Sequence, residues 1–412
     1  MNIKSLKLKA ECISHSDPSF WKSLSVLGQA QYKCGDLKSA LDAFTESLKC
    51  QSLYYLGSLP DDTAFSKSIV LMALETIRET LQSMGEKSRI QIEEDLEQFA
   101  LTLNVLGIIN QEMGNITDAI ESFDLCFLAR NIKPSRDYEA LGHTADTLGL
   151  LYFGTGEHQK ALSAFRDALS IKESGLGEKS LEVARTLNNM GNVYFAKGKL
   201  DEAIEHYNQS YEIKKQVLGS NHEEVANTLN NIAHVLFKID RREDSFKTYV
   251  EVFQMRRTLY GDDSLAIAVT YCNIGDVQVQ LGHLEAAKDC FERCLQIRAI
   301  HKYSNYEDNV RIMESLARIE GKLGLWNNAA TLYRGIIDIR KNRLGQEKTE
   351  ILSKTYQLLA HAFIEQQQYD DALPHLYEAL RIRTLYILSS SSEEISELMH
   401  VINFCKAKQQ KI

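Results

Sequence analysis

The sequence predicts an all-α protein, a right-handed solenoid of tandem helix-turn-helix repeats that ends in a capping helix. Three observations support this prediction. A pattern of small and aromatic residues recurs with a period of 42 residues over most of the chain. Apolar residues within each period follow helical spacing. Only four of the 412 residues are proline, which is rare inside helices.

The repeat unit is clearest at residues 184–219, ARTLNNMGNVYFAKGKLDEAIEHYNQSYEIKKQVLG. Each half of this stretch places apolar residues on one helical face. Gly198 stands between the halves, where a left-handed glycine ends one helix and allows a tight reversal into the next. Gly191 is small enough for the two helices to approach closely, and Tyr207 supplies a large side chain that packs between them.

The same positions recur along the chain. The small residue at the helix crossing is Gly28, Gly107, Gly149, Gly191, Ala233, Gly275, Ala317 and Ala360. The turn residue seven positions later is Gly35, Gly114, Gly156, Gly198, Asp240, Gly282, Gly324 and Gln367. The large residue of the second helix is Phe44, Phe123, Phe165, Tyr207, Tyr249, Phe291, Tyr333 and Leu376. Asp240 breaks the glycine pattern, so we expect the turn of its repeat to be looser or shifted.

Three regions follow from this register. Residues 1–19 form a lead-in, residues 20–387 form the solenoid with about eight clear repeats, and residues 388–412 hold a serine-rich break and the capping helix. Residues 58–95 interrupt the period, and we expect a degenerate repeat there, with helices at 66–84 and 88–107 after the turn LGSLPDD. The capping helix is expected to cover the last repeat with Ile395, Leu398, Met399 and Ile402 on one face.

Composition restricts the kinds of partner. The formal net charge of −9 argues against an extended nucleic-acid surface. The longest apolar runs, such as residues 69–74, are too short to cross a bilayer, and the first residues lack a secretory signal, so we expect a soluble cytoplasmic protein without membrane insertion.

The eight cysteines are scattered, as expected for reduced thiols. Cys290 and Cys294 lie one helical turn apart and could face a metal. However, Cys294 takes the position of Ala168 and Ser210 in other repeats, which favours a buried structural role. We expect neither a metal nor a cofactor.

No catalytic pattern stands out. The chain lacks a phosphate-binding glycine loop, a His-Glu-x-x-His motif and a nucleophile elbow, and its glycines are explained by the repeat. His143, His234 and His361 fall on first helices, where groove or surface positions explain them. We therefore expect a protein that is not an enzyme.

The recurring small, turn and large residues resemble those of tetratricopeptide repeats. The 42-residue variety is similar to the repeats of kinesin light chains, with the matches VARTLNNMGNVYFAKGKLDEA and VANTLNNIAHVLF. This resemblance covers roughly residues 20–387. It implies a protein-interaction scaffold whose first helices line a concave groove for extended segments of partner proteins. The chain lacks the long heptad region by which a kinesin light chain would bind its heavy chain.

Carried over by repeat position, the resemblance implies a set of groove residues. They are Arg185, Asn188, Asn189, Asn192, Asn227, Asn230, Asn231, His234, Lys238, Asn273, Asp276, Arg311, Arg318 and Lys322. An asparagine amide both donates and accepts hydrogen bonds, so a ladder of asparagines suits an extended peptide backbone, and the arginines favour acidic residues. The asparagines could instead solvate an exposed helix face or bond across adjacent helices.

Two hypotheses of function result. The first is a scaffold or adaptor that binds partner segments in the groove. The second is a stable regulatory subunit of a larger assembly that uses its convex face or its ends, with the cargo adaptor of a motor as one such role. An exposed apolar patch near residues 60–100 or on the capping helix would favour the second hypothesis.

Overall fold

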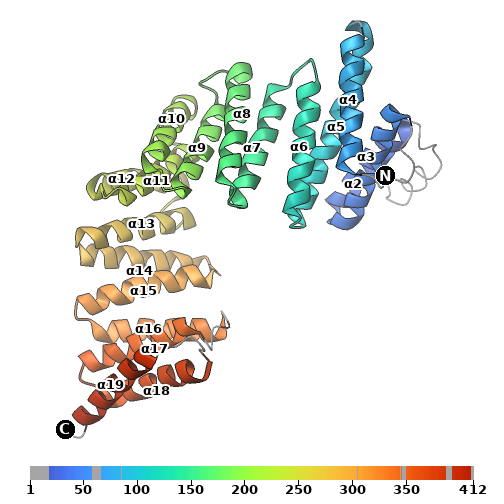
Figure 1. The fold of residues 1–412 in the computed structure, drawn as a ribbon. Coiled ribbons are helices and arrows are strands. Elements are labelled where there is room, and N and C mark those ends of the chain that lie inside the picture. The colour runs from blue at the N-terminus through green and yellow to red at the C-terminus, as the bar shows by residue number, and fades with distance from the viewer. Residues whose placement is uncertain are drawn as a thin grey trace. The chain divides into compact units, whose positions relative to one another are not determined.

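The computed structural model describes residues 18–57, 66–84, 86–303, 305–343, 345, 349–386 and 392–409, and the regular secondary structure of these residues is entirely helical. The chain divides into two compact units, Met1–Val217 and Leu218–Ile412 (Figure 1). The expected lead-in before residue 18, most of the LGSLPDD turn and the serine-rich break at 388–391 lie outside the described residues.

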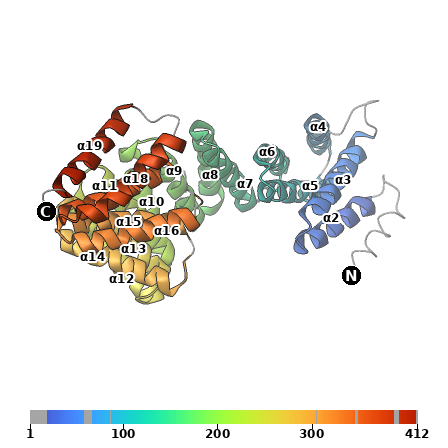
Figure 2. The same ribbon diagram turned by 90° about the horizontal axis from the view of Figure 1, so that it is seen from below.

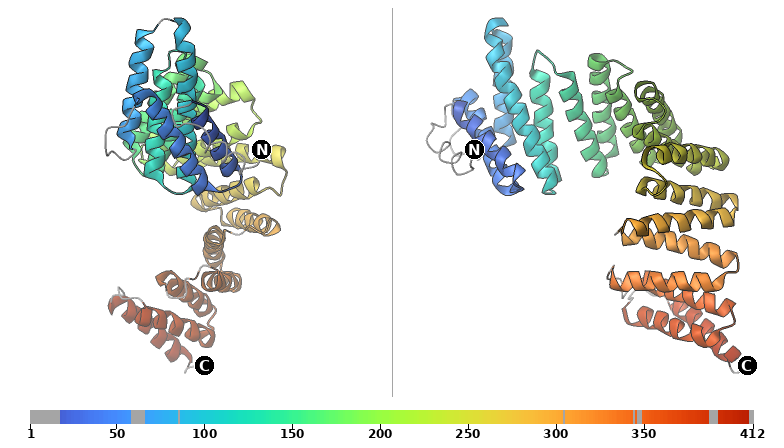
Figure 3. Two further views of the ribbon diagram at one scale, coloured as in Figure 1. Left: turned by 90° about the vertical axis from the view of Figure 1, so that its right-hand side faces the viewer. Right: turned by 180° about the vertical axis from the view of Figure 1, so that it is seen from behind.

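The first unit holds α2 (Pro18–Lys33), α3 (Leu37–Leu56), α4 (Lys67–Ser83), α5 (Glu86–Glu112), α6 (Ile116–Ile132), α7 (Tyr138–Gly154), α8 (His158–Leu176), α9 (Leu181–Ala196) and α10 (Leu200–Leu218). The second unit holds α11 (Glu223–Lys238), α12 (Arg242–Tyr260), α13 (Leu265–Leu281), α14 (Leu284–Ile300), α15 (Tyr306–Lys322), α16 (Trp326–Asn342), α17 (Glu350–Glu365), α18 (Tyr369–Tyr386) and α19 (Ser392–Gln409). In the second unit successive helices stack as antiparallel pairs (Figure 3).

The small residue at the helix crossing packs directly on the large residue of the second helix, as the sequence predicts. A methyl group added at Gly149 would lie 2.6 Å from the ring of Phe165, closer than non-bonded carbon atoms approach. At Gly191 the nearest ring atom of Tyr207 would be equally close, at 2.6 Å. Glycine at the crossing therefore lets the two helices of a repeat share one aromatic side chain.

The turn residue is left-handed in every repeat, including those without glycine. Asp240 has φ 65° and Gln367 has φ 60°, close to the 72° of Gly198. The amide of Arg241 donates to the carbonyl of Leu236 at 2.9 Å, the counterpart of a 2.9 Å bond that closes the turn after Gly198. The expectation of a looser or shifted turn at Asp240 is therefore wrong, because aspartate tolerates this conformation better than most residues.

The irregular region between the first two clear repeats contains one added helix and one lengthened helix. Helix α4 packs against α3 and α6 (Figure 2), and α5 runs without a break into the first helix of the next repeat. Leu74 and Ile77 of α4 share a buried cluster with Phe99 and Leu103 of α5. Where the sequence predicts a degenerate helix pair, the structure thus has α4 beside the extended start of α5.

A column of buried cations joins successive repeats, and the sequence analysis did not identify it. Its members lie near the ends of second helices, 42 residues apart until a last step of 43. They are the half-buried Arg130 and the buried Lys172, Lys214, Arg256, Arg298, Arg340 and Arg383. Lys172 is completely buried and pairs with Asp146 on the preceding first helix. Its ammonium also donates to the hydroxyl of Thr186 on the following first helix at 3.1 Å.

The same arrangement recurs in the second unit. Arg256 donates to the hydroxyl of Thr270 at 2.8 Å, and Arg340 bonds Thr355 in the corresponding place. Because Lys172, Arg256 and Arg340 are buried, their hydrogen bonds compensate for lost hydration, and each of these three clasps ties a repeat to the next one within its unit.

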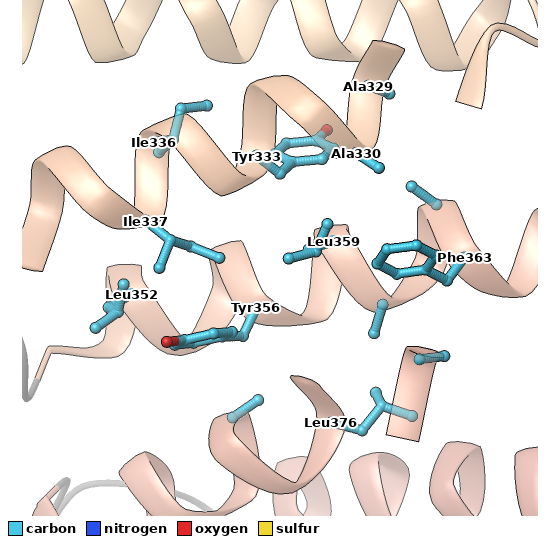
Figure 4. Close-up of a cluster of buried hydrophobic side chains, with 14 of the residues drawn as sticks. Ala329, Ala330, Tyr333, Ile336, Ile337, Leu352, Tyr356, Leu359, Phe363 and Leu376 are labelled. Carbon is cyan, nitrogen blue, oxygen red and sulfur yellow. The ribbon is translucent and has the colours of Figure 1, made fainter. Parts of the chain in front are cut away.

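The core of the last repeats shows how the apolar columns meet (Figure 4). Tyr333 and Ile337 of α16, Leu359 and Phe363 of α17 and Leu376 of α18 belong to one buried cluster. A single helix pair cannot bury these side chains alone, so the cluster forms only where neighbouring pairs stack.

Helix α19 completes the second unit by covering α18. Leu398, Ile402 and Cys405 are buried against the preceding repeat. Met399, which we expected on the covered face, is 41% exposed. The buried stripe follows residues 398, 402 and 405, so Cys405 takes the place that the prediction assigned to Met399.

Candidate functional site

The predicted groove residues lie on α9 in the first unit and on α11, α13 and α15 in the second. All of them are exposed or half-buried, and none is buried. Within each helix they are spaced by three, four or seven residues, apart from the adjacent pairs Asn188–Asn189 and Asn230–Asn231, which places them along one side. We call this side of each first helix the first-helix face.

On α9, two polar residues already have partners within the chain. A guanidinium nitrogen of Arg185 lies 2.5 Å from a carboxylate oxygen of Glu182. The hydroxyl of Tyr207 donates to the side-chain oxygen of Asn192 at 2.7 Å. Asn192 therefore helps to fix the aromatic side chain at the helix crossing, while Asn189 is half-buried on the same face.

On α11 and α13, asparagines bond between helices. The amide of Asn273 donates to the side-chain oxygen of Asn230 at 3.1 Å, which links two successive first helices. The side-chain oxygen of Asn227 accepts from the buried Arg256 at 2.9 Å. Cross-helix bonding, one of the alternatives open from sequence, is thus present. Each amide can form further bonds, because it carries two donors and an acceptor with two lone pairs.

A polar hollow of about 300 Å³ opens between α13 and α15. Three predicted groove residues, Asp276, Arg318 and Lys322, line it together with Ser315. The two cations belong to a row on α15 that begins at Arg311, and all three are exposed. Spacing of seven and then four residues keeps this row on one side of the helix.

The charges around this hollow are unequal. Burial raises the pKa of Asp276 above its usual value, and the nearby Arg311 and Arg318 oppose that rise. On α11, desolvation and then Lys238 lower the pKa of His234, so its imidazole is mostly neutral at pH 7. At the hollow itself the cations Arg318 and Lys322 outnumber the one acidic lining residue, Asp276, although the net charge of the chain is negative.

Two features of the first-helix faces were not predicted from sequence. In the first unit Leu101 of α5 and Leu150 of α7 are 40% and 49% exposed, so the face is partly apolar. In the second unit a cavity of about 500 Å³ lies among α17, α18 and α19 and includes Leu358 and His361. Leu358 stands two residues before the small residue of its repeat, as Asn231 and Asn273 do in theirs. A leucine in place of asparagine at this repeat position is the sequence signal that could have identified the cavity.

Among the described residues, no cluster of three or more histidine, cysteine, aspartate or glutamate side chains is arranged to hold a metal. None of the helices in that same part of the chain has the length and apolar character needed to cross a membrane.

Comparison with protein families gives one match. The family model of the tetratricopeptide repeat matches residues 98–174, 182–244 and 224–299. Curated protein sequences gave no match.

Several solved structures resemble the chain. A signal transduction ATPase with numerous domains and a tetratricopeptide repeat sensor, from Pyrococcus horikoshii, has 14% identity and a TM-score of 0.58, covering 94% of this chain and 55% of that one. BtubC (BKLC) from P. vanneervenii has 18% identity and a TM-score of 0.48, covering 58% and 94%. Repeats of a putative kinesin light chain from Podosopora anserina have 17% identity and a TM-score of 0.45, covering 51% and 99%.

Proposed function

The chain is a tetratricopeptide repeat protein, a member of a family of protein-interaction scaffolds, and we propose that it binds extended acidic segments of partner proteins on its first-helix faces. The cationic row Arg311, Arg318 and Lys322 beside the hollow between α13 and α15 is the observation that carries this proposal. Exposed guanidinium groups pair with carboxylates in two-point contacts, and the hollow gives room for a side chain.

The asparagines support the same function in a shared role. Asn189 and Asn231 hold equivalent positions on α9 and α11 and are half-buried. Amides at such positions can bond the backbone of an extended segment whatever its side chains are. Asn192, Asn227 and Asn273 also bond within the chain, so their replacement would disturb packing as well as binding.

Binding of a short fluorescent peptide of alternating glutamate and serine, followed by anisotropy, tests the proposal. The variant Arg318→Glu/Lys322→Glu should weaken binding roughly 10- to 100-fold, because attraction is replaced by repulsion at two positions. Lys247→Glu, at an exposed position of the second helix α12, is the matched control and should bind as the wild type does. Equal loss in both variants would mean that only overall charge matters.

The alternative function, a stable subunit of a larger assembly, is favoured by exposed apolar residues away from the first-helix faces. Leu71 and Met72 on α4 are 36% and 46% exposed, and Phe404 on α19 is 48% exposed. Such a role predicts copurification with a fixed partner that survives the double charge reversal on α15, and size-exclusion chromatography of the native complex distinguishes the two.

A further inference from the structure

Helix α19 has an exposed face that flanks its buried stripe. Glu393, Glu397, Val401, Phe404 and Lys408 follow one another at intervals of three or four residues and therefore share one side of the helix. Val401 is 39% exposed and Phe404 is 48% exposed, and the three charged residues are exposed as well. We call these five residues the α19 outer face.

The charges of the α19 outer face are ordered along the helix. Its start is acidic, its middle is apolar and its end is basic, with the Lys408 ammonium 5.7 Å from the centre of the Phe404 ring. Among the described residues, no cation pairs with the carboxylates of Glu393 and Glu397. A surface with this order is complementary to itself when it is turned end for end.

We propose that the protein forms a two-fold symmetric dimer in which α19 packs antiparallel against α19 of a second copy. We place the two-fold axis beside the point between residues 400 and 401 of each helix. Glu393 of each copy then faces Lys408 of the other copy, and Phe404 of each copy faces Glu397 of the other. The two ion pairs are then related by symmetry, as an isologous interface requires, and Val401 of each copy lies beside the axis.

The cavity beside α19 supplies the place for the aromatic ring. This cavity of about 500 Å³ is lined by apolar side chains, among them Leu358, Leu398 and Val401, and by charged ones that include Glu397. Because Phe404 of the second copy lies opposite Glu397 in the antiparallel arrangement, its ring is next to the cavity and fills it on association. An aromatic side chain in an apolar pocket is a typical anchor of a protein interface.

The dimer is expected to be reversible. A single helix pair buries less than the standard interface of roughly 1,600 Å². This inference does not rest on the proposed peptide binding, because the dimer uses the cavity beside α17, whereas the cationic row that carries the peptide proposal lies on α15. If both hold, the dimer presents two copies of the cationic row, which strengthens binding to partners with repeated segments.

Sedimentation velocity of the full chain over micromolar concentrations tests the proposal. The 46.8 kDa chain should show concentration-dependent formation of a species of twice that mass. Phe404→Asp should weaken association at least roughly tenfold, since a charge replaces the apolar anchor. Met399→Asp is the matched control, because Met399 is 41% exposed on another side of the same helix, and it should dimerise as the wild type does.

A charge exchange fixes the antiparallel register. Glu393→Lys and Lys408→Glu should each weaken self-association roughly tenfold, since two symmetric pairs become repulsive. An equimolar mixture of the two variants should dimerise again, because both pairs are restored in the mixed species. Lys406→Glu, whose lysine lies over Tyr377 within its own chain, should have no effect.

Three results would overturn the proposal. They are a monomeric mass at every concentration, a dimer that Phe404→Asp leaves intact, and failure of the mixed charge variants to associate although each has the helicity of the wild type by circular dichroism.

Discussion

The helix crossing in α7 offers a quantitative test of the packing account. Gly149→Ala adds a methyl group whose carbon would lie 2.6, 2.7 and 2.8 Å from three ring atoms of Phe165. Alanine is favoured over glycine in a helix by about 1 kcal/mol. Overpacking costs about 1–3 kcal/mol, so we expect a net destabilisation of up to about 2 kcal/mol.

Gly154→Ala is the matched control for this substitution. Gly154 ends the same helix, and a methyl group added there has no neighbour within 4 Å. Only the helical preference remains, so this variant should be neutral or more stable by up to about 1 kcal/mol. Urea unfolding followed by circular dichroism measures both.

A double variant separates crowding from other effects. In the background Phe165→Leu, the ring that Gly149→Ala meets is absent, and the alanine should no longer destabilise. The natural pair Ala360 and Leu376 occupies the equivalent positions in the last repeat. Equal losses of stability in Gly149→Ala and Gly154→Ala, or a loss that Phe165→Leu fails to relieve, would refute the reasoning.

Three further predictions concern the turn, the clasps and the hollow. Asp240→Gly should stabilise the second unit by about 1 kcal/mol in urea unfolding, because Asp240 has φ 65°, and a destabilised variant would contradict this. Lys172→Met should cost about 3–5 kcal/mol by leaving Asp146 buried without its cation, and Lys172→Met/Asp146→Leu should lose less; equal losses would show that the pair matters only for volume. Asp276→Asn should tighten binding of the acidic peptide several-fold at pH 7, since a repulsive charge is removed. Because the pKa of Asp276 is raised, this aspartate becomes neutral at a higher pH than usual, so the ratio of the two affinities should approach one as the pH falls, and a constant ratio would exclude it as the cause.

Much of the fold could be predicted because several positions of the repeat require a residue of a particular size or backbone conformation. Gly149 and Phe165 recur at fixed spacing, and each pair implies a close helix crossing. Left-handed turns were predicted where glycine occurs, but Asp240 shows that the surrounding repeat also imposes the turn on a residue with a weaker preference. Local sequence alone does not contain that tertiary constraint.

Other features depend on contacts between distant residues. The position of Lys172 follows the same 42-residue period as glycine, but a lysine ordinarily indicates exposed surface, so its burial with Asp146 was missed. Helix α4 carries an apolar face without the repeat columns, and its packing on α3 and α6 has no sequence signature.

For the candidate site, the polar residues chosen from the repeat register are exposed or half-buried in the structure, and their role in binding stays a prediction. It does not separate residues that bond within the chain, such as Asn273 with Asn230, from the cations of α15. Hydrogen bonds of this kind depend on the distance between neighbouring first helices, and the spacing of residues in the sequence does not give that distance.

The central claim, that the first-helix faces hold the partner, is tested most directly by affinity purification from native extract with three chains. They are the wild type, the first-helix variant Asn189→Ala/Asn231→Ala/Arg318→Glu, and the second-helix variant Asn208→Ala/Asn327→Ala/Lys247→Glu, whose three positions are exposed. Circular dichroism first establishes equal helicity. We predict that specific partners bind the wild type and the second-helix variant and are lost from the first-helix variant. Retention of the same partners by the first-helix variant would contradict the account.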